Sequence, residues 1–186
     1  LQGTRSPKGS VGDVDRRLLD FASRTALDYV GLSFVESVED VDEVRSILGD
    51  GGPRIVAKIE TQRGIDALGP IASRADVLMV DRGDLSLDTG LEQLGLLQKQ
   101  IISGARAHAR PVIVATEMLQ TMIEEPVPSK AEVTDITNAI LDGCGATMLS
   151  GETAVGRHPV EAVRLMAGVA SAAEAHLQDV LDQVPT

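Results

Sequence analysis

Short runs rich in Val and Ile alternate with helix-length segments along most of the chain, and this alternation limits the folds open to it. Five runs have the length and composition of strands: residues 28–35, 54–60, 76–80, 111–116 and 146–150. Runs that are apolar throughout are typical of strands covered on both faces, and strands separated by helices usually run parallel. The pattern predicts an α/β fold of about five parallel β/α units.

Two of the intervening segments carry a clear helical period. Within residues 91–109, Leu94, Leu97, Ile101 and Ala105 recur at spacings of three and four, as one buried helical face requires. The last segment repeats this spacing with Val163, Met166, Ala170, Ala173, Leu177 and Leu181, and Pro159 lies near its start, where a missing N–H costs little. No linker divides the chain, so residues 13–186 are predicted to form one domain after a loop or tail at residues 1–12.

The composition argues against nucleic acid and membranes as partners. The 186 residues carry a formal net charge of −11 and include no Trp, one Tyr and two Phe. Nucleic acid is therefore an unfavourable partner, because its binding depends on clustered Lys and Arg and on stacking rings. No apolar run approaches the roughly 20 residues that span a bilayer, so no membrane partner is expected. The single cysteine, Cys144, excludes an intramolecular disulfide, and the cytoplasm is the expected location.

Polar residues gather at the carboxyl-terminal ends of the predicted strands. The candidates are Lys58 and Glu60, then Asp81, Arg82, Gly83 and Asp84, then Thr116 and Glu117, and finally Ser150 and Glu152. In parallel α/β folds, ligands bind where the loops after the strands converge. Taken singly, each residue is better explained as a solvated loop residue or a helix cap, but five strands in a row that end this way favour a site. Lys58 and Glu60 fit that alternative least, because the strand period of two points both to one face of an apolar strand.

The residue types favour a small anion held beside a divalent metal. Glu60 and Asp84 offer carboxylate oxygens, which suit Mg²⁺ or Mn²⁺ better than zinc. A turn at Gly83 would bring backbone N–H groups to a substrate carboxylate, and Lys58 would add the positive charge that a developing enolate needs. Further substrate contacts are predicted at Arg82, Asp84, Ser150 and Glu152. The alternative is a structural ion network formed by Lys58, Glu60, Arg82 and Asp84.

Five stretches, in order, resemble signature stretches of the pyruvate kinase family: "VAKIETQRGID", "VLMVDRGDL", "RPVIVATEMLQTMI", "PSKAEVTDITNAILDG" and "ATMLSGETAVGRHPVEAV". The resemblance covers roughly residues 28–175 and implies a partial TIM barrel, with the five strands matching the fourth to eighth strands of the family's barrel. By position it implies that Lys58 stabilises the phosphoryl group and the enolate, and that Glu60 and Asp84 bind Mg²⁺. It also implies that Gly83 and Asp84 N–H groups bind the carboxylate of phosphoenolpyruvate or pyruvate, and that Thr116 takes part in proton transfer.

The chain also departs from the family's pattern. Stretches matching the first three barrel strands are absent, and with them the family's substrate-binding arginine and potassium ligands, so potassium is not expected. The lid domain and the C-terminal regulatory domain are absent too. Asp81 stands where the kinases usually have Ala, Glu117 where they usually have Gln, and Glu36 where a basic residue often lies. Each change adds negative charge near a site that would hold anions.

These departures lead us to expect a metal-dependent enzyme of the lyase, aldolase or decarboxylase type. It would act on pyruvate, phosphoenolpyruvate or a related small oxoacid through an enolate, without ATP. Two alternatives stay open: a repurposed domain with a binding role or unrelated chemistry, and a fragment of a true pyruvate kinase, a phosphotransferase. Asp81 and Glu117 could be catalytic or could simply reshape the pocket.

Assembly is the last expectation. An open five-stranded sheet would expose an apolar inner face and two edges, which proteins rarely leave uncovered. A second copy of the chain is the simplest cover. A homodimer or larger homo-oligomer is therefore predicted, with residues 126–143, around Lys130, at or near the contact.

Overall fold

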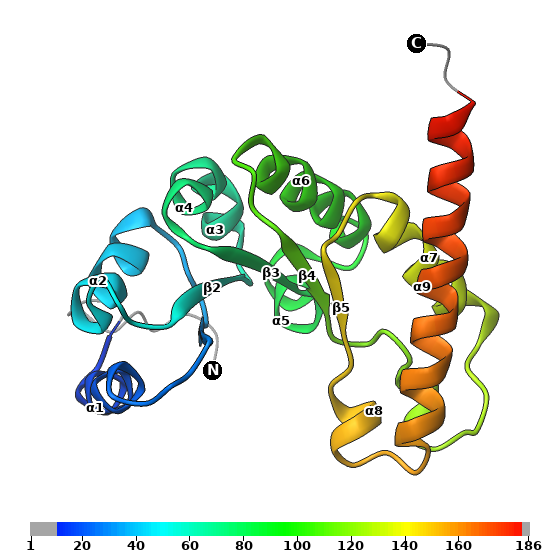
Figure 1. Ribbon diagram of the computed structural model, residues 1–186, viewed down its shortest axis with the longest axis horizontal. Helices are drawn as coiled ribbons and strands as arrows, with labels where there is room; N and C mark the ends of the chain where they lie inside the picture. Colours follow the sequence, from blue (N-terminus) through cyan, green and yellow to red (C-terminus); the bar gives the residue numbers. More distant parts are fainter. Residues whose placement is uncertain (1–10, 184–186) are drawn as a thin grey trace.

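The computed structural model describes residues 11–183 and contains one parallel sheet of five strands (Figure 1). The strands are β1 (Tyr29–Leu32), β2 (Arg54–Ile59), β3 (Val77–Asp81), β4 (Val112–Ala115) and β5 (Ala146–Met148), and they lie side by side in chain order. All the pairings are parallel. The predicted α/β class and partial-barrel arrangement are confirmed, and each strand overlaps its predicted range.

Helices connect the strands and flank them. They are α1 (Asp13–Ser23), α2 (Val38–Leu48), α3 (Gln62–Asp66), α4 (Leu68–Arg74), α5 (Arg82–Thr89), α6 (Leu94–Ala107), α7 (Lys130–Leu141), α8 (Gly151–Ala154) and α9 (Pro159–Asp182), with a 3₁₀ turn η1 (Gln120–Ile123). Several begin at side-chain caps. At α7, the Ser129 hydroxyl accepts the Glu132 N–H at 3.2 Å and a Glu132 carboxylate oxygen accepts the Ser129 N–H at 2.7 Å.

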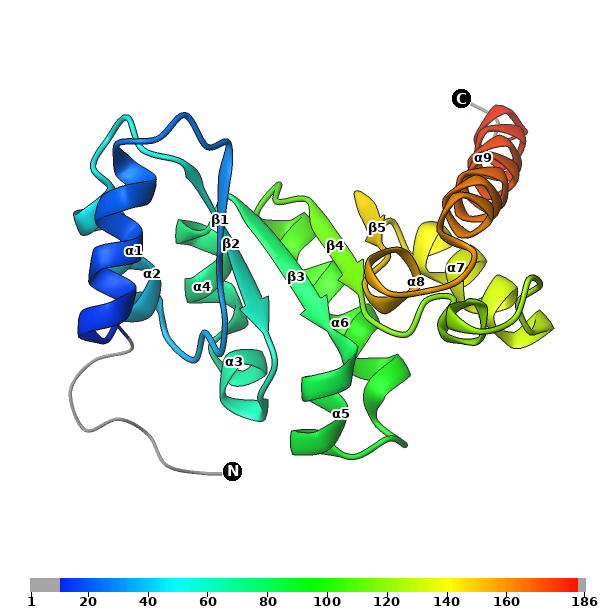
Figure 2. The same cartoon turned by 90° about the horizontal axis from the view of Figure 1, so that it is seen from below.

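One face of the sheet is buried against the helices. Figures 1 and 2 together show α2, α4 and α6 along this outer face. Alternate strand residues point into the core there, as the period of two requires: Ile55, Ala57 and Ile59 from β2, Leu78 and Val80 from β3, and Val112 and Val114 from β4. They pack with helix residues such as Val44, Ile71 and Ile101. This core fixes the strand ends on which the candidate site is built.

The opposite, inner face carries a smaller apolar cluster. Its members are Val56, Val77, Met79 and Ala115, with Ile113 and Met148 packed against them. A hollow of about 360 Å³ lies over the amino-terminal part of this face and is lined by residues that include Tyr29, Val56 and Pro111. The predicted homo-oligomer, with its contact near Lys130, stays a prediction.

One boundary differs from the sequence pattern. The sequence predicts a turn around Gly83, but α5 begins at Arg82 directly after β3, so Gly83 and Asp84 lie in the first turn of a helix. At the start of the described residues, Val11 is buried and Gly12 immediately precedes α1. Residues 1–10 of the predicted tail lie outside the described residues.

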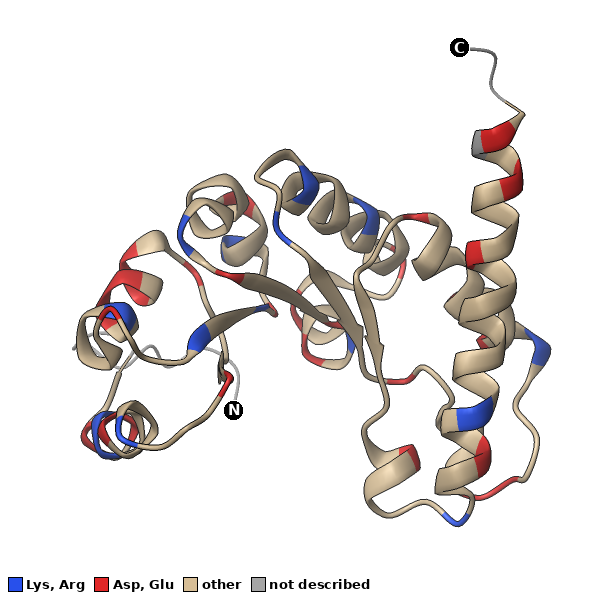
Figure 3. Cartoon of the chain, viewed as in Figure 1, with Lys and Arg blue, Asp and Glu red and all other residues tan. Residues whose placement is uncertain are grey.

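Charged residues lie mostly on helices and loops, whereas β4 and β5 carry none (Figure 3). Charges meet the sheet chiefly at the carboxyl ends of β2 and β3, through Lys58 and Asp81. No helix within residues 11–183 combines the length and the apolar character that a membrane span requires.

Asp76 ties the start of β3 to its neighbours. One carboxylate oxygen accepts the Ile55 N–H at 2.8 Å and an Arg45 guanidinium N–H at 2.7 Å. Burial alone would raise the pKa of Asp76, but the Ile55 N–H and the Arg45 charge outweigh it and hold the pKa below its ordinary value. The ionised carboxylate therefore stabilises the fold.

We expect Asp76→Asn to lower the free energy of unfolding by about 1–2 kcal/mol at pH 7, because a charged hydrogen-bond acceptor is lost. Since the folded pKa is lowered, this contribution is present above the ordinary carboxyl pKa and disappears as the pH falls through the folded value. Urea unfolding at pH 7 and pH 3 measures both effects. Asp42→Asn is the control, because Asp42 pairs with Arg74 on the exposed surface, where ion pairs contribute little. Equal losses in the two variants would contradict the role of Asp76.

Candidate functional site

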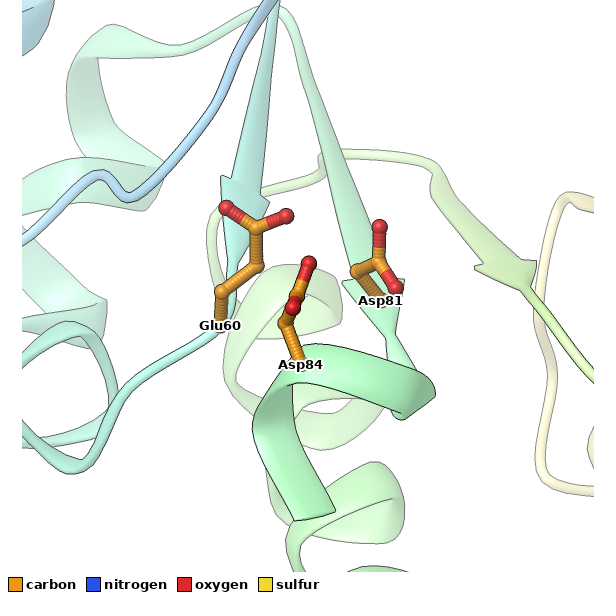
Figure 4. Close-up of side chains that lie close together, drawn as sticks. All are labelled: Glu60, Asp81 and Asp84. Atoms are coloured by element: carbon orange, nitrogen blue, oxygen red, sulfur yellow. The ribbon is translucent and has the colours of Figure 1, made fainter. Parts of the chain in front are cut away.

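Three carboxylates converge where β2 and β3 end. Glu60 follows the last residue of β2, Asp81 is the last residue of β3, and Asp84 lies in the first turn of α5. Figure 4 shows the three carboxylates directed into the same space. Each can offer one oxygen so that the three atoms lie within 4.8 Å of one another. The sequence-predicted pair Glu60 and Asp84 is therefore brought together, and Asp81 joins it.

Lys58 binds two of these carboxylates. Its ammonium lies 2.6 Å from Glu60 Oε1 and 2.9 Å from Asp81 Oδ2, and it donates to Ser33 Oγ at 3.3 Å. The other Glu60 oxygen accepts the Phe34 backbone N–H. Phe34 has a φ of +54°, which is uncommon for a residue with a side chain, so the loop after β1 is held in an unusual conformation beside the carboxylate.

Burial and charge act on both partners of this pair. Burial raises the pKa of Glu60 above its ordinary value, and the bonds from Lys58 and the Phe34 N–H oppose this only in part. Burial lowers the pKa of Lys58, but the hydrogen bonds and charges of Glu60 and Asp81 outweigh it, so the pKa of Lys58 lies above its ordinary value. Lys58 is thus a fixed cation at neutral pH.

The cluster of Lys58, Glu60, Asp81 and Asp84 holds more negative than positive charge. When ionised, its three carboxylates outnumber its one ammonium by two charges. A divalent cation would balance that excess, and carboxylate oxygens are the ligands that Mg²⁺ and Mn²⁺ prefer. The donor set and its spacing therefore fit a divalent metal.

Thr116 and Gly83 lie next to this cluster. The Gly83 N–H donates to Thr116 Oγ1 at 3.0 Å, and the Thr116 hydroxyl lies 2.6 Å from the Ala115 carbonyl oxygen. A Cβ placed on Gly83 would lie 3.8 Å from both Asp81 Oδ1 and Thr116 Oγ1. Gly83 therefore separates the acidic cluster from the threonine, and its missing side chain leaves space between them.

Arg82 is buried and binds the backbone of Thr116. It is 5% exposed, and its Nε and Nη2 donate to the Thr116 carbonyl oxygen at 3.0 and 2.7 Å. Its Nη1 pairs with Asp135 on α7. The guanidinium is thus directed at α7 and the loop after β4, away from the Lys58 cluster. A direct substrate contact by Arg82 stays a prediction.

The remaining predicted residues lie on the loops after β4 and β5. Glu117 is exposed and has a φ of +53°, and it is not one of the three converging carboxylates. Ser150 is partly buried, and its N–H donates to Glu152 Oε2 at 2.8 Å. Glu152 is 1% exposed and its other oxygen accepts the Leu119 N–H at 2.9 Å. The substrate contacts predicted for Ser150 and Glu152 stay predictions.

Some residues of the site could not be found from the sequence. Asp135 lies on a helix like many surface aspartates, and nothing in its neighbourhood marks it as the partner of Arg82. The Phe34 N–H that binds Glu60 is a backbone group whose direction depends on a positive φ, which the sequence "LSFVE" does not signal. Asp81 was visible in the sequence, but its pairing with Lys58 depends on the register of β2 and β3.

Comparison with known proteins decides the family. The family profile described as pyruvate kinase, barrel domain, matches residues 1–163. The chain belongs to the pyruvate kinase family. It is 41% identical to the pyruvate kinase of Thermotoga maritima over 171 residues, which are 91% of this chain and 37% of that protein. Identity to the enzyme of Mycobacterium tuberculosis is 44% over 176 residues, 94% of this chain and 37% of the relative.

The pyruvate kinase of Corynebacterium glutamicum is 44% identical over 167 residues, covering 89% of this chain and 35% of that protein. The chain thus spans little more than a third of the length of these curated relatives. These relatives are all pyruvate kinases, so the comparisons favour the phosphotransferase alternative over the lyase-type enzyme expected from the sequence. Nothing in them supports lyase chemistry.

Proposed function

We propose that this chain carries the metal-binding and enolate-stabilising part of a pyruvate kinase site, which transfers a phosphoryl group between phosphoenolpyruvate and ADP. The single observation that carries the proposal is the pairing of Lys58 with Glu60 and Asp81, beside Asp84, within a barrel domain of the pyruvate kinase family. The names of the relatives supply the reaction class.

Lys58 supplies the fixed positive charge in this proposal. Transfer of the phosphoryl group leaves negative charge on the enolate oxygen, and a preorganised cation in a partly buried site stabilises that charge more than water does. The ammonium is already held by two carboxylates and Ser33, so it needs little rearrangement to act. When bound, a divalent metal at Glu60 and Asp84 would add Lewis-acid charge at the same place.

Gly83 and Asp84 would receive the substrate carboxylate in this proposal, with Thr116 beside them. Gly83 and Asp84 lie in the first turn of α5, where backbone N–H groups lack helical partners and favour anions. The Gly83 N–H donates to Thr116 Oγ1, so a proton-carrying hydroxyl lies beside the proposed carboxylate position, and the carboxylate would share this N–H with it. Proton transfer to or from the enolate carbon is the role proposed for Thr116.

The added negative charges weigh less against a kinase than the sequence implied. Glu36 pairs with Arg63 at 3.3 Å, and Glu117 is exposed outside the group of three converging carboxylates. Only Asp81 enters the cluster, and there it binds Lys58. Of the added negative charges that favoured a lyase without ATP, only that of Asp81 lies in the cluster.

Exchange of the methyl protons of pyruvate with D₂O tests the proposed chemistry, because it requires enolate formation but no nucleotide. We expect the chain with Mn²⁺ or Mg²⁺ to exchange these protons above the metal-only background, and Lys58→Met to lower the protein-dependent rate by about 100-fold. Proton NMR of pyruvate measures the rate directly.

Lys99→Met is the matched control, because the exposed Lys99 forms an ion pair with the partly buried Asp142 outside the Lys58 cluster. Exchange that is equal in the Lys58 and Lys99 variants would contradict the role of Lys58. Release of pyruvate from oxaloacetate much faster than methyl exchange would favour the lyase-type alternative instead.

Gly83→Ala should separate folding from binding. Within the chain a Cβ at this position meets only ordinary contacts at 3.8 Å, so the variant should fold and gain about 0.5–1 kcal/mol from the better helix former. The same methyl would occupy the space between Asp81 and Thr116, so affinity for oxalate, a small mimic of the pyruvate enolate, should fall about tenfold or more, roughly 1.4 kcal/mol.

Calorimetric titration with oxalate in the presence of Mg²⁺, together with thermal unfolding, measures both quantities. Gly95→Ala in α6 is the control, because a Cβ there meets nothing within 4 Å and should raise stability without changing oxalate binding. Unchanged oxalate affinity in Gly83→Ala would place the substrate elsewhere.

A further inference from the structure

The loop after β4 holds two neighbouring residues in the left-handed backbone region. Thr116 has a φ of +66° and Glu117 a φ of +53°. Such a conformation is uncommon for residues with side chains and rarer still for a β-branched residue such as Thr. It persists only where the surroundings hold it in place. The surroundings of Thr116 therefore decide where its hydroxyl lies.

Two separate elements hold this loop. At its start, Arg82 donates twice to the Thr116 carbonyl oxygen and the Gly83 N–H donates to Thr116 Oγ1. At its end, the Leu119 N–H donates to Glu152 Oε1 at 2.9 Å. The first anchor belongs to α5 and the second to α8, so the loop is fixed between the structures that follow β3 and β5.

Holding the loop through Glu152 requires a buried carboxylate. Glu152 is 1% exposed and forms no ion pair with another described residue, although burying a carboxylate without a cation is costly. Its oxygens accept two backbone N–H groups, those of Leu119 and Ser150. An ionised carboxylate has two acceptor oxygens, whereas a glutamine has one acceptor and one donor group. Because the two N–H groups bind different oxygens, a glutamine here would place its NH₂ group opposite one of these donors.

We propose that Glu152 is a positioning residue, which fixes the loop of residues 116–119 so that the Thr116 hydroxyl stays on the Gly83 N–H beside the Lys58 cluster. The effect of Glu152 on the reaction rests on the proposed function, because it acts through Thr116. The effect of Glu152 on the position of the loop does not depend on that function. This assignment differs from the direct substrate contact predicted from the sequence.

Glu152→Gln tests the proposal through backbone hydrogen exchange, measured residue by residue by NMR on the ¹⁵N-labelled chain. We expect the Leu119 N–H to exchange at least about tenfold faster, because the NH₂ group of the amide replaces one of the two oxygens that now accept these N–H groups and disturbs the anchor. We also expect the Gly83 N–H, on the far side of the loop, to exchange faster as Thr116 moves. Faster exchange at Leu119 with Gly83 unchanged would overturn the proposal.

Glu132→Gln is a matched control, because Glu132 also accepts two backbone N–H groups, from Thr121 and Ser129, each at 2.7 Å. It should accelerate exchange at Thr121 and Ser129 and leave Gly83 unaffected. If Glu132→Gln accelerates exchange at Gly83 as much as Glu152→Gln does, the effect is a general loss of stability, and the proposal is overturned. If Glu152→Gln does not fold, Glu152→Asp keeps the carboxyl group but is too short to reach both donors, and the same expectations apply.

A second readout separates positioning from substrate contact. With Mn²⁺ present, Glu152→Gln should slow methyl-proton exchange of pyruvate about tenfold or more without changing the pyruvate concentration at half-maximal rate. A rise in that concentration with an unchanged maximal rate would instead show a substrate contact and overturn the proposal. If the unmodified chain exchanges no protons, the proposed function fails, while the amide-exchange results still decide the role of Glu152.

Discussion

The sharing of one ammonium by two buried carboxylates, with a third carboxylate close by, is the interaction on which this site depends. Lys58 binds Glu60 and Asp81, and Asp84 adds its charge without an ion pair to any residue within 11–183. Three like charges within 4.8 Å repel one another, and one ammonium offsets only part of that repulsion. The arrangement is electrostatically incomplete by itself. A divalent cation and an anionic substrate are the species that would complete it.

The parallel sheet holds these charged side chains close together. Helices cover the outer face and leave the strand ends fixed by an apolar core, so Lys58 and Asp81 are placed by register rather than by flexible loops. The loops are then held by a few polar bonds, such as Phe34 N–H to Glu60 and Leu119 N–H to Glu152. A buried charge that binds a backbone N–H serves two purposes here: it compensates part of its own burial and fixes the loop.

The sequence was informative where a repeated pattern carried the signal. The apolar runs predicted all five strands, and the period of two placed Lys58 and Glu60 on one face. It was uninformative where a contact depends on a single backbone conformation or on distant register. The start of α5 at Arg82 was expected as a turn, because Gly83 signals a turn more strongly than a helix start. The partner of Arg82 could not be predicted either, because its bond to Asp135 joins residues that are 53 positions apart in the sequence.

Titration with Mn²⁺, followed by the electron paramagnetic resonance of the free ion, tests the central claim most directly. The charge excess of the cluster predicts one site per chain, with affinity at least about tenfold weaker in Glu60→Gln and in Asp84→Asn. Asp88→Asn, one turn further along α5, should bind Mn²⁺ like the unmodified chain, because Asp88 accepts the Gln62 N–H instead. Circular dichroism would show that each variant is folded. Unchanged Mn²⁺ affinity in both folded cluster variants would contradict the account and leave the Lys58 cluster as a structural ion network.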